Sequence, residues 1–313
     1  MKKIGKKIGM MLLTLLFVSL LVFLAFSIIP SDPATTILGF DASEESIEAL
    51  REEMGLNQPV LIQYAKWIGN ALTGDFGYSY SYQISVQELL HDKIIITCVL
   101  SGLSFLLLLL ISIPLGVFSA KRKGHKVDSL ITFLCQINMA IPQFFIGIML
   151  TYFFGIVLRI FTPGKFVSYQ DNVFAFLLYL MLPAISIALP KIAMTVKVLR
   201  NAIVEEVGKD YVRTAYSRGN SSGNVFYKHI LKNAFIPLVT FVGMILTDLL
   251  VGSIIIEQVF GIPGLGRILL SSISNRDYPV VQATILFLAF FVLIVNFVIE
   301  ILYQIVDPKV RNV

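Results

Sequence analysis

Charged residues are scarce in this sequence, and their scarcity excludes most soluble folds. Of the 313 residues, 14% are charged and 56% are hydrophobic. A soluble globular domain carries about a quarter charged residues. The mean hydropathy of +0.81 agrees with this deficit. The composition therefore places the chain among membrane proteins.

Cysteine and histidine are also rare, which argues against a disulfide scaffold and a metal site. Cys98 and Cys135 lie in apolar stretches and form no C-x-x-C pattern, so we expect both thiols to be buried as small hydrophobic side chains. The three histidines, His91, His125 and His229, are far apart and have no neighbours at ligand spacing. No metal and no cofactor is predicted.

Catalytic signatures are missing as well. No G-x-x-x-x-G-K-[ST] pattern occurs, so the chain is not expected to bind or hydrolyse ATP itself. The glycine-rich "GIPGLG" at 261–266 resembles a phosphate-binding loop only in its glycine content. The G-x-S-x-G and H-E-x-x-H patterns are also missing. We therefore predict that the protein is not an enzyme.

Long apolar runs are what the sequence does contain. A membrane-spanning helix takes about 20 apolar residues. The predicted spans lie at about 8–29, 94–120, 129–158, 173–199, 235–259 and 281–306. The first run follows a basic start, as in a signal peptide, but it exceeds the usual core of about 7–15 residues and no A-x-A site follows. We predict a retained anchor and an all-α membrane protein with six transmembrane helices.

Lys and Arg are unevenly distributed between the two sides of these spans. Eighteen of the 25 fall in 1–7, in 121–127, in the last part of the fourth span (Lys191 and Lys197) and on to residue 234, and in 307–313. The segment 30–93, on the other side, holds ten of the 20 acidic residues. Because basic loops stay in the cytoplasm, both termini are predicted to be cytoplasmic in a bacterial-type cytoplasmic membrane. The basic residues follow the topology, so no nucleic-acid partner is expected.

This topology divides the chain into segments. They are an N-terminal transmembrane helix at 1–29, an external segment at 30–93, a transmembrane core at 94–306 with a cytoplasmic loop at 201–234, and a cytoplasmic tail at 307–313.

The external segment is expected to hold two short helices. Ser43 can cap the first, and Gly55 suits its end. The second follows Pro59, and "GDFGYSY" at 74–80 is predicted to be a turn. The residues expected on one face of the second helix are Leu61, Tyr64, Ile68 and Leu72. Such a segment is either a small cap on the span ends or a docking surface or gate.

The predicted cytoplasmic loop has "KDYVRTAYSRGNSSG" at 209–223 as its centre. The helix of the fourth span can continue into it, because Glu205 and Lys209 form an i, i+4 pair. The residues that would then lie near one face are Val204, Val207, Tyr211 and Ala215.

Two small residues, Ala215 and Gly219, lie four apart in this loop, so another backbone can approach closely there. Gly219 can end the helix, and Ser221 can cap a second helix that runs into Pro237 and the fifth span. The alternative is an ordinary basic loop held at the lipid headgroups.

The segments "DYVRTAYSRG" and "HILKNAFIP" resemble the cytoplasmic coupling loop of ABC importer permeases. Further matches, which include "LNQPVLIQYAKWIGNALTGDFGYSY", "AIPQFF", "LPAISIALPKIA" and "EQVFGIPGLGRILLSSISNRDYPVVQA", extend the resemblance to almost the whole chain. The pairing of "GDFGYS" with "PGLG…RDYP" is similar to the first permease of the peptide/nickel branch.

The resemblance implies a type I ABC importer transmembrane fold. It also implies a second, homologous permease, two ATP-binding cassette ATPase subunits and an external substrate-binding protein. The helix in the coupling loop would sit in a groove of the ATPase. The positions carried over by motif match are Asp210, Tyr211, Arg213, Ala215, Arg218 and Gly219.

The sequence departs from the family pattern at two positions of this loop. Asn220 stands where the family usually has an apolar residue, and Gly223 loosens the start of the next helix. Both departures concern how the turn packs.

Asp248 lies near the middle of the fifth span, where an ionisable group is costly and usually faces protein or water. It is either a pathway residue that favours cationic groups or a polar contact to the partner permease. Glu257 and Glu300 are expected at the membrane interfaces, and Gly252 at a close helix contact. The candidates for an external gate or loop are Gly261, Pro263, Gly264, Gly266, Arg276 and Asp277.

The function that the sequence favours is that of a permease subunit for di- or oligopeptides, driven by separate ATPases through alternating access. One alternative is the same machine importing nickel or another metal chelate. A more distant alternative is a self-contained secondary transporter, which would leave the coupling loop unexplained.

Overall fold

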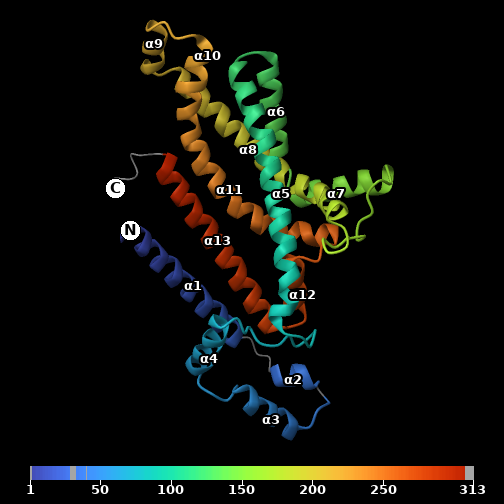
Figure 1. The fold of residues 1–313 in the computed structure, drawn as a ribbon. Helices are drawn as coiled ribbons and strands as arrows, with labels where there is room; N and C mark the ends of the chain where they lie inside the picture. Colours follow the sequence, from blue (N-terminus) through green and yellow to red (C-terminus); the bar gives the residue numbers. More distant parts are fainter. Residues whose placement is uncertain (1, 29–32, 40, 307–313) are drawn as a thin grey trace. The chain divides into compact units, whose positions relative to one another are not determined.

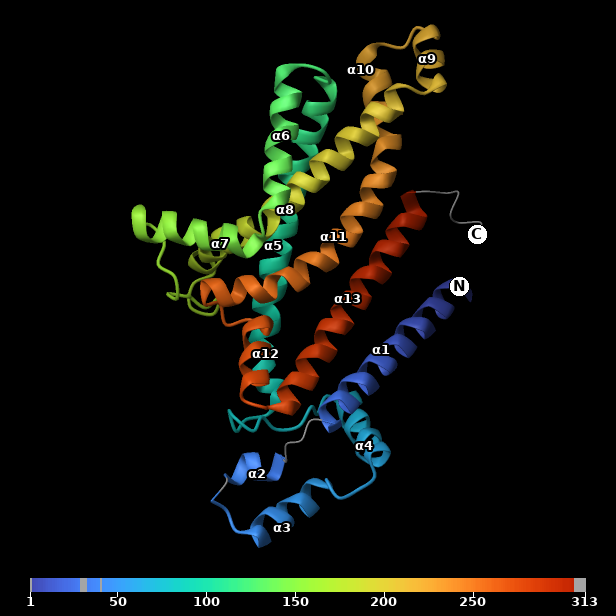
Figure 2. The same cartoon turned by 180° about the vertical axis from the view of Figure 1, so that it is seen from behind.

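The structure, a computed structural model, describes residues 2–28, 33–39 and 41–306. Within these ranges the chain is helical, and its β pairing is limited to one bridge between Tyr78 and Ser85. Figures 1 and 2 show the helices from opposite sides. The two compact units of the chain are Met1–Ile96 with Pro263–Ile294, and Thr97–Ile262 with Val295–Val313. We refer to them as unit 1 and unit 2.

Among the described residues, five helices are long and apolar enough to cross a membrane. They are Gly5–Ile28 in α1 (Lys2–Ile28), α5 (Val86–Lys121), α8 (Val173–Val207), the stretch Ser222–Phe260, and Tyr278–Ile301 in α13 (Tyr278–Val306). The stretch Ser222–Phe260 consists of α10 (Ser222–Asn224), the π-helical η2 (Val225–Ile230) and α11 (Leu231–Phe260). These helices confirm five predicted spans. The stretch Ser222–Phe260 also confirms a helix that runs through Pro237.

The third predicted span is not one straight helix. Lys126–Ala140 and Gln143–Val157 meet at an angle of 96°. The cause is Pro142, whose ring excludes Ile141 from the helical conformation, and Ile141 is extended, with φ −93° and ψ 125°. α6 (Lys126–Ala140) therefore ends before it, and α7 (Gln143–Thr151) continues into the π-helical η1 (Tyr152–Val157). The predicted single span is a bent pair.

Unit 1 contains the short helices predicted after α1, together with α2 (Pro33–Leu38). In α3 (Glu44–Met54) the Ser43 hydroxyl accepts from the Ser46 amide at 3.3 Å, and Gly55 ends the helix with φ 69°. α4 (Val60–Leu72) begins directly after Pro59. The cap and the end of α3 and the start of α4 are as predicted.

The face that α4 presents to its neighbours agrees with the prediction only in part. Tyr64 and Ile68 are half-buried, whereas Leu61 and Leu72 are exposed. The ring of Tyr64 packs on Phe23 of α1, and so does that of Trp67, which was not on the predicted face, with centroids 5.5 and 5.8 Å away. Aromatic rings bury more area than leucine, so they determine which face of the helix packs.

The core of unit 1 joins α5, α12 (Leu265–Ser274) and α13. Its buried members are Val86, Leu90, Leu265, Ile268, Val280 and Ala283. Together they anchor the start of α5 against the segment that follows residue 263.

The core of unit 2 extends to the short helix α9 (Asp210–Ser217). Both views show α9 and α10 at the ends of α8 and α11 (Figures 1 and 2). The buried residues of this cluster are Ala120, Leu199, Ile203, Val212, Ala215, Val225, Ile230, Ala234 and Leu238. We call this set the α9 core. Elsewhere in the unit, Cys98 and Cys135 are half-buried rather than buried, because their helix faces are only partly covered.

Candidate functional site

The helix of the fourth span continues into the loop, as predicted, but it stops at Val207 instead of running on to Gly219. α8 ends at Val207, and Lys209 is extended, with φ −78° and ψ 148°, before α9 begins at Asp210. Glu206 accepts hydrogen bonds from the ammonium of Lys209 and from the hydroxyl of Tyr211, the latter at 2.5 Å. Glu205 lies farther from Lys209, at 3.9 Å. Glu206 thus holds a sharp turn, and the loop has one more helix break than expected.

These contacts change the acid–base behaviour of the turn. The hydrogen bond to Glu206 raises the pKa of the Lys209 ammonium. Burial, followed by the hydrogen bond to Glu206, raises the pKa of the Tyr211 phenol. At neutral pH both groups therefore keep the protons that they donate to the Glu206 carboxylate.

α9 has one buried face and one exposed face. Val212 and Ala215 are buried in the α9 core, and Tyr211 packs against its edge. Asp210 and Arg213 point away from it and are almost fully exposed, with 3.9 Å between their charged groups. Of the six motif positions, Ala215 thus faces the core of this chain, whereas Asp210, Arg213, Arg218 and Gly219 are exposed.

Gly219 ends α9 by adopting a backbone conformation that other residues rarely adopt. Its φ is +79°, and a Cβ at this position would meet nothing within 4 Å. The need for glycine is therefore conformational, as at many helix ends. Another backbone was predicted to approach Ala215 and Gly219. Among the described residues, Ala215 packs in the α9 core, whereas nothing approaches Gly219 closely.

Asn220 stabilises the turn after α9. Its side-chain amide donates to the Ala215 carbonyl at 3.0 Å, and its oxygen accepts from the Asn224 amide at 3.1 Å. The Ser221 hydroxyl accepts from the Asn224 backbone N–H at 3.4 Å, so the predicted cap is present. Gly223 lies inside α10 with open space around it. The side-chain amide of Asn220 thus closes this turn with two hydrogen bonds.

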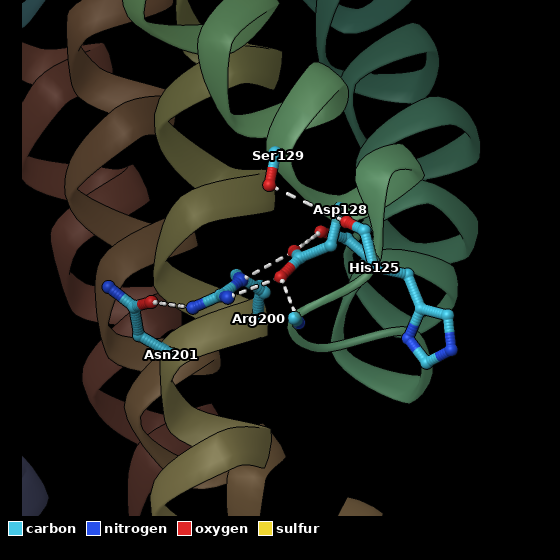
Figure 3. A network of polar contacts seen from close by, with 7 residues as sticks. His125, Asp128, Ser129, Arg200 and Asn201 are labelled. Carbon is cyan, nitrogen blue, oxygen red and sulfur yellow. Dashed lines mark hydrogen bonds and ion pairs between the residues drawn. The ribbon is translucent and has the colours of Figure 1, made fainter.

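A second polar centre in unit 2, around Asp128, was missed by the sequence reasoning. Its carboxylate accepts from Arg200 Nε at 2.9 Å and Arg200 Nη2 at 2.6 Å, as Figure 3 shows. Ser119 Oγ donates to it at 2.6 Å and the Gly124 amide at 3.1 Å. The side chain of Asp128 is 5% exposed and that of Arg200 21%. Asp128 lies in the first turn of α6, where acidic residues are common. The sequence therefore gave no sign of its pairing with Arg200.

Asp248, the predicted pathway residue, forms an ion pair. Lys191 Nζ on α8 lies 2.7 Å from Asp248 Oδ2 on α11. Asp248 remains 58% exposed, whereas Lys191 is 19% exposed. One side of the carboxylate is thus neutralised and the other is open. Lys191 was visible in the sequence, but nothing there linked it to a residue 57 positions away.

Glu257 was expected at a membrane interface and is instead fully buried in protein. Thr97 Oγ1 donates to its carboxylate at 2.6 Å. At Gly252, an added Cβ would come within 2.8 Å of the Gln143 side chain, which donates to the Gly252 carbonyl at 3.1 Å. The predicted close contact is therefore present, and its partner is α7. Glu300 is exposed.

The predicted gate residues of unit 1 centre on Asp277. Its buried carboxylate accepts from Ser79 Oγ at 2.5 Å and from the amides of Tyr80 and Ser81, both at 3.1 Å. It thereby holds the predicted turn of "GDFGYSY". Burial, followed by the negative charge of Asp277, raises the pKa of the Tyr80 phenol above its ordinary value.

The other gate positions have separate places. Gly261 ends α11 with φ 69°. Gly264, which follows Pro263, is the N-cap residue of α12, and Gly266 is buried in the first turn of that helix. Arg276 is exposed, with φ 56°. Within the described residues no group of three or more His, Cys, Asp or Glu side chains lies close enough to hold a metal.

The long apolar helices of the described residues indicate a multi-span integral membrane protein. The model of the family "Binding-protein-dependent transport system inner membrane component" matches residues 112–312. The model of the N-terminal part of the same kind of membrane component matches residues 1–101. The chain belongs to this family of transport-system membrane components.

Similar proteins align over nearly their whole length. The oligopeptide transport system permease protein AppB of Bacillus subtilis is 36% identical over 95% of each chain. The probable peptide ABC transporter permease protein y4tP of Sinorhizobium fredii is 33% identical over 94% of each chain. The dipeptide transport system permease protein DppB of Alkalihalophilus pseudofirmus is 30% identical over 98% of each chain.

Proposed function

We propose that this chain is a permease subunit of an ATP-driven ABC importer that carries di- or oligopeptides across the cytoplasmic membrane. The names of its similar proteins support a peptide cargo. The observation that carries the proposal is the two-sided α9, with Val212 and Ala215 in the core of unit 2 and Asp210 and Arg213 exposed. A helix of this kind can pass a displacement from a partner to the spans.

α9 is the coupling helix in this proposal. Its exposed side docks on an ATPase subunit, with Tyr211 at the edge and Arg213 and Arg218 supplying charge at the rim. Its buried side moves α8 and α11 through the α9 core when ATP-driven closure displaces the ATPases. The loop is folded into a helix that packs in the α9 core. This supports a mechanical role for the loop over a role in holding lipid headgroups.

The full machine contains a second homologous permease, two ATP-binding cassette subunits that hydrolyse ATP, and an external substrate-binding protein. Both termini are cytoplasmic, 30–93 is external, and 201–234 is the cytoplasmic loop of the core at 94–306. The distribution of Lys and Arg supports this orientation. The residues 261–277 would then supply parts of an external gate, and Asp277 holds the turn at 79–81 of the external segment.

Asp248 belongs to the transport pathway and acts together with Lys191. The pair is neutral as a whole, so it lowers the cost of placing either charge within a span. The exposed side of Asp248 can accept an ammonium group of a passing peptide. We expect Asp248→Asn to alter peptide uptake while the amount of assembled complex stays the same. Unchanged uptake of every peptide tested would remove Asp248 from the pathway.

The proposal is tested with the chain reconstituted with its partner subunits in proteoliposomes. Uptake of radiolabelled dialanine and of a labelled tetrapeptide is measured with ATP and with a non-hydrolysable analogue. We expect ATP-dependent uptake that is abolished by Tyr211→Ala combined with Gly219→Arg and preserved in Lys228→Gln. Lys228 is an exposed basic residue of the same loop that lies outside α9.

Three outcomes would contradict this proposal. Uptake by the chain alone would indicate a self-contained transporter. Uptake of a nickel–histidine chelate with no peptide uptake would assign a different cargo. Normal uptake in the double variant would remove α9 from the coupling step.

A further inference from the structure

The carboxylate of Asp128 joins three helices of unit 2. Ser119 belongs to the last turn of α5, Asp128 to the first turn of α6, and Arg200 to the last third of α8. Figure 3 shows the Arg200 guanidinium approaching the carboxylate from the side opposite to the turn before α6. Both carboxylate oxygens accept two hydrogen bonds each. A bidentate Arg–carboxylate pair fixes orientation as well as distance.

The α9 core lies directly beside this polar centre. Ala120 and Leu199, the neighbours of Ser119 and Arg200 in sequence, pack in the same cluster as Val212 and Ala215 of α9. α5 and α8 also approach closely here. A Cβ placed on Gly116 would lie 3.1 Å from Leu199 Cβ. The polar centre and the base of α9 are therefore parts of one packed region.

The position of Arg200 along α8 matters for how a displacement spreads. With a rise of about 1.5 Å per residue, Arg200 lies only about 10 Å from the end of α8. Pro183 and Pro190 interrupt the hydrogen bonding of α8 farther from α9. Without a lateral connection, a displacement of α9 would be absorbed by bending at these prolines. A connection at Arg200 passes it to α5 and α6 first.

We propose that Asp128 and Arg200 are positioning residues for energy coupling, which lock the α5–α6 hairpin to the end of α8 so that a displacement of α9 moves all three helices together. The inference rests on the proposed docking of α9 on an ATPase. It adds a second requirement, because apolar packing between these helices allows sliding, whereas a bidentate Arg–carboxylate pair fixes their orientation.

The test uses the complete complex in proteoliposomes and measures peptide uptake, ATP hydrolysis and subunit content in parallel. We expect Asp128→Asn to lower the number of peptides moved per ATP by about tenfold while ATP hydrolysis and subunit content stay near normal. Arg200→Lys keeps the charge but loses the bidentate geometry, and its ratio should fall less. Lys126→Gln removes an exposed charge from the same helix turn and should behave as wild type.

A covalent replacement tests the mechanical part of the proposal. Gly116→Cys with Leu199→Cys, in a background with Cys98 and Cys135 replaced by Ala, can form a disulfide after a small shift toward the usual Cβ separation of about 3.8 Å. In the Asp128→Asn variant this bond should restore the uptake-to-hydrolysis ratio when oxidised, and reduction should abolish the restoration. A purely structural role for Asp128 would not respond to oxidation in this way.

Several results would overturn the inference. A wild-type ratio in both Asp128→Asn and Arg200→Lys would do so, and so would loss of complex from the membrane in both, which would make the pair a folding element. An oxidised disulfide that forms without restoring the ratio would also do so. Failure of the proposed function looks different, since ATP-dependent uptake would then be missing, or insensitive to the α9 double variant, in the complex with Asp128 intact.

Discussion

Two buried aspartates, one in each unit, hold their surroundings by different means. Asp128 in unit 2 is paired with the guanidinium of Arg200, so its charge is neutralised. Asp277 in unit 1 accepts from one hydroxyl and two backbone amides, which stabilise a negative charge without cancelling it. The first joins helices through side chains, and the second folds a turn through its backbone.

The difference follows from what each carboxylate has to hold. Helices expose no free backbone donors along their sides, so a carboxylate between helices needs side-chain partners. An irregular segment such as 80–81 has N–H groups without a backbone partner, and a buried carboxylate satisfies them. We expect the stability of the region around Asp128 to depend mainly on one partner, Arg200. The stability of the region around Asp277 should depend on several donors, each with a smaller contribution.

The largest expected effect comes from removing Arg200. Arg200→Met leaves the Asp128 carboxylate buried without its counter-charge, which should cost about 3–5 kcal/mol of unfolding free energy. The loss is measured by detergent titration of the purified protein in mixed micelles. Lys197→Met, one turn earlier on α8, is the matched control. Equal losses in the two variants would show that the Asp128 pair has no special weight.

A smaller loss is expected at Asp277. Asp277→Asn keeps the shape but replaces charge-assisted hydrogen bonds with neutral ones, which should cost about 2–3 kcal/mol. Release of the turn is measured by chymotrypsin cleavage after the exposed Tyr78 and Tyr82. Asp75→Asn changes an exposed acid that accepts from the Gly77 amide at 2.9 Å, and it should cleave as wild type. Resistance of Asp277→Asn to cleavage would refute the dependence of the turn on this carboxylate.

Gly219 tests the end of α9 on a scale of about 1 kcal/mol. Gly219→Ala forces a Cβ into a left-handed conformation, with φ +79°, without creating a clash. The amides of α9 should exchange faster with deuterium, as followed by mass spectrometry. Gly223→Ala is the control, because Gly223 lies in a helix and alanine should slow exchange there slightly. Unchanged exchange in Gly219→Ala would show that the turn does not depend on glycine.

Local features of this fold were predictable from the sequence, and distant pairings were not. Ser43, Gly55 and Ser221 act where capping rules place them, because a cap involves residues only a few positions apart. Asp128 and Arg200 are 72 positions apart, and Ser79 and Asp277 are 198 apart. No spacing rule connects such residues. Only packing of the helices brings them together.

The error at the end of α8 has a similar origin. The Glu205–Lys209 spacing fits a continuous helix, but the short-range contacts of Glu206 with Lys209 and Tyr211 win. A surface i, i+4 pair contributes only about 0.3–0.5 kcal/mol, which is less than burial of the α9 face contributes. Packing of Val212 and Ala215, together with the contacts of Glu206, therefore outweighs the Glu205–Lys209 pair.

The smallest expected effect concerns Tyr80, which lies beside Asp277. Its titration should make the stability of that region depend on alkaline pH. Burial and the charge of Asp277 raise the pKa of the Tyr80 phenol in the folded protein. The unfolded phenol titrates near pH ~10. Below that pH, Tyr80 is protonated in both states and the stability is independent of pH. Above it, only the unfolded state loses the proton, so the stability of unit 1 should fall as pH rises.

Tyr80→Phe should remove this fall and leave the stability near neutral pH almost unchanged. The phenolate absorbance of wild type minus variant, followed from neutral pH upward, should show one tyrosine that ionises later than the others. Chymotrypsin cleavage of the turn, measured in the same pH series, should increase in wild type and stay flat in the variant. A phenol that titrates normally would show that Asp277 faces an open turn, and the contrast with the enclosed Asp128 would be lost.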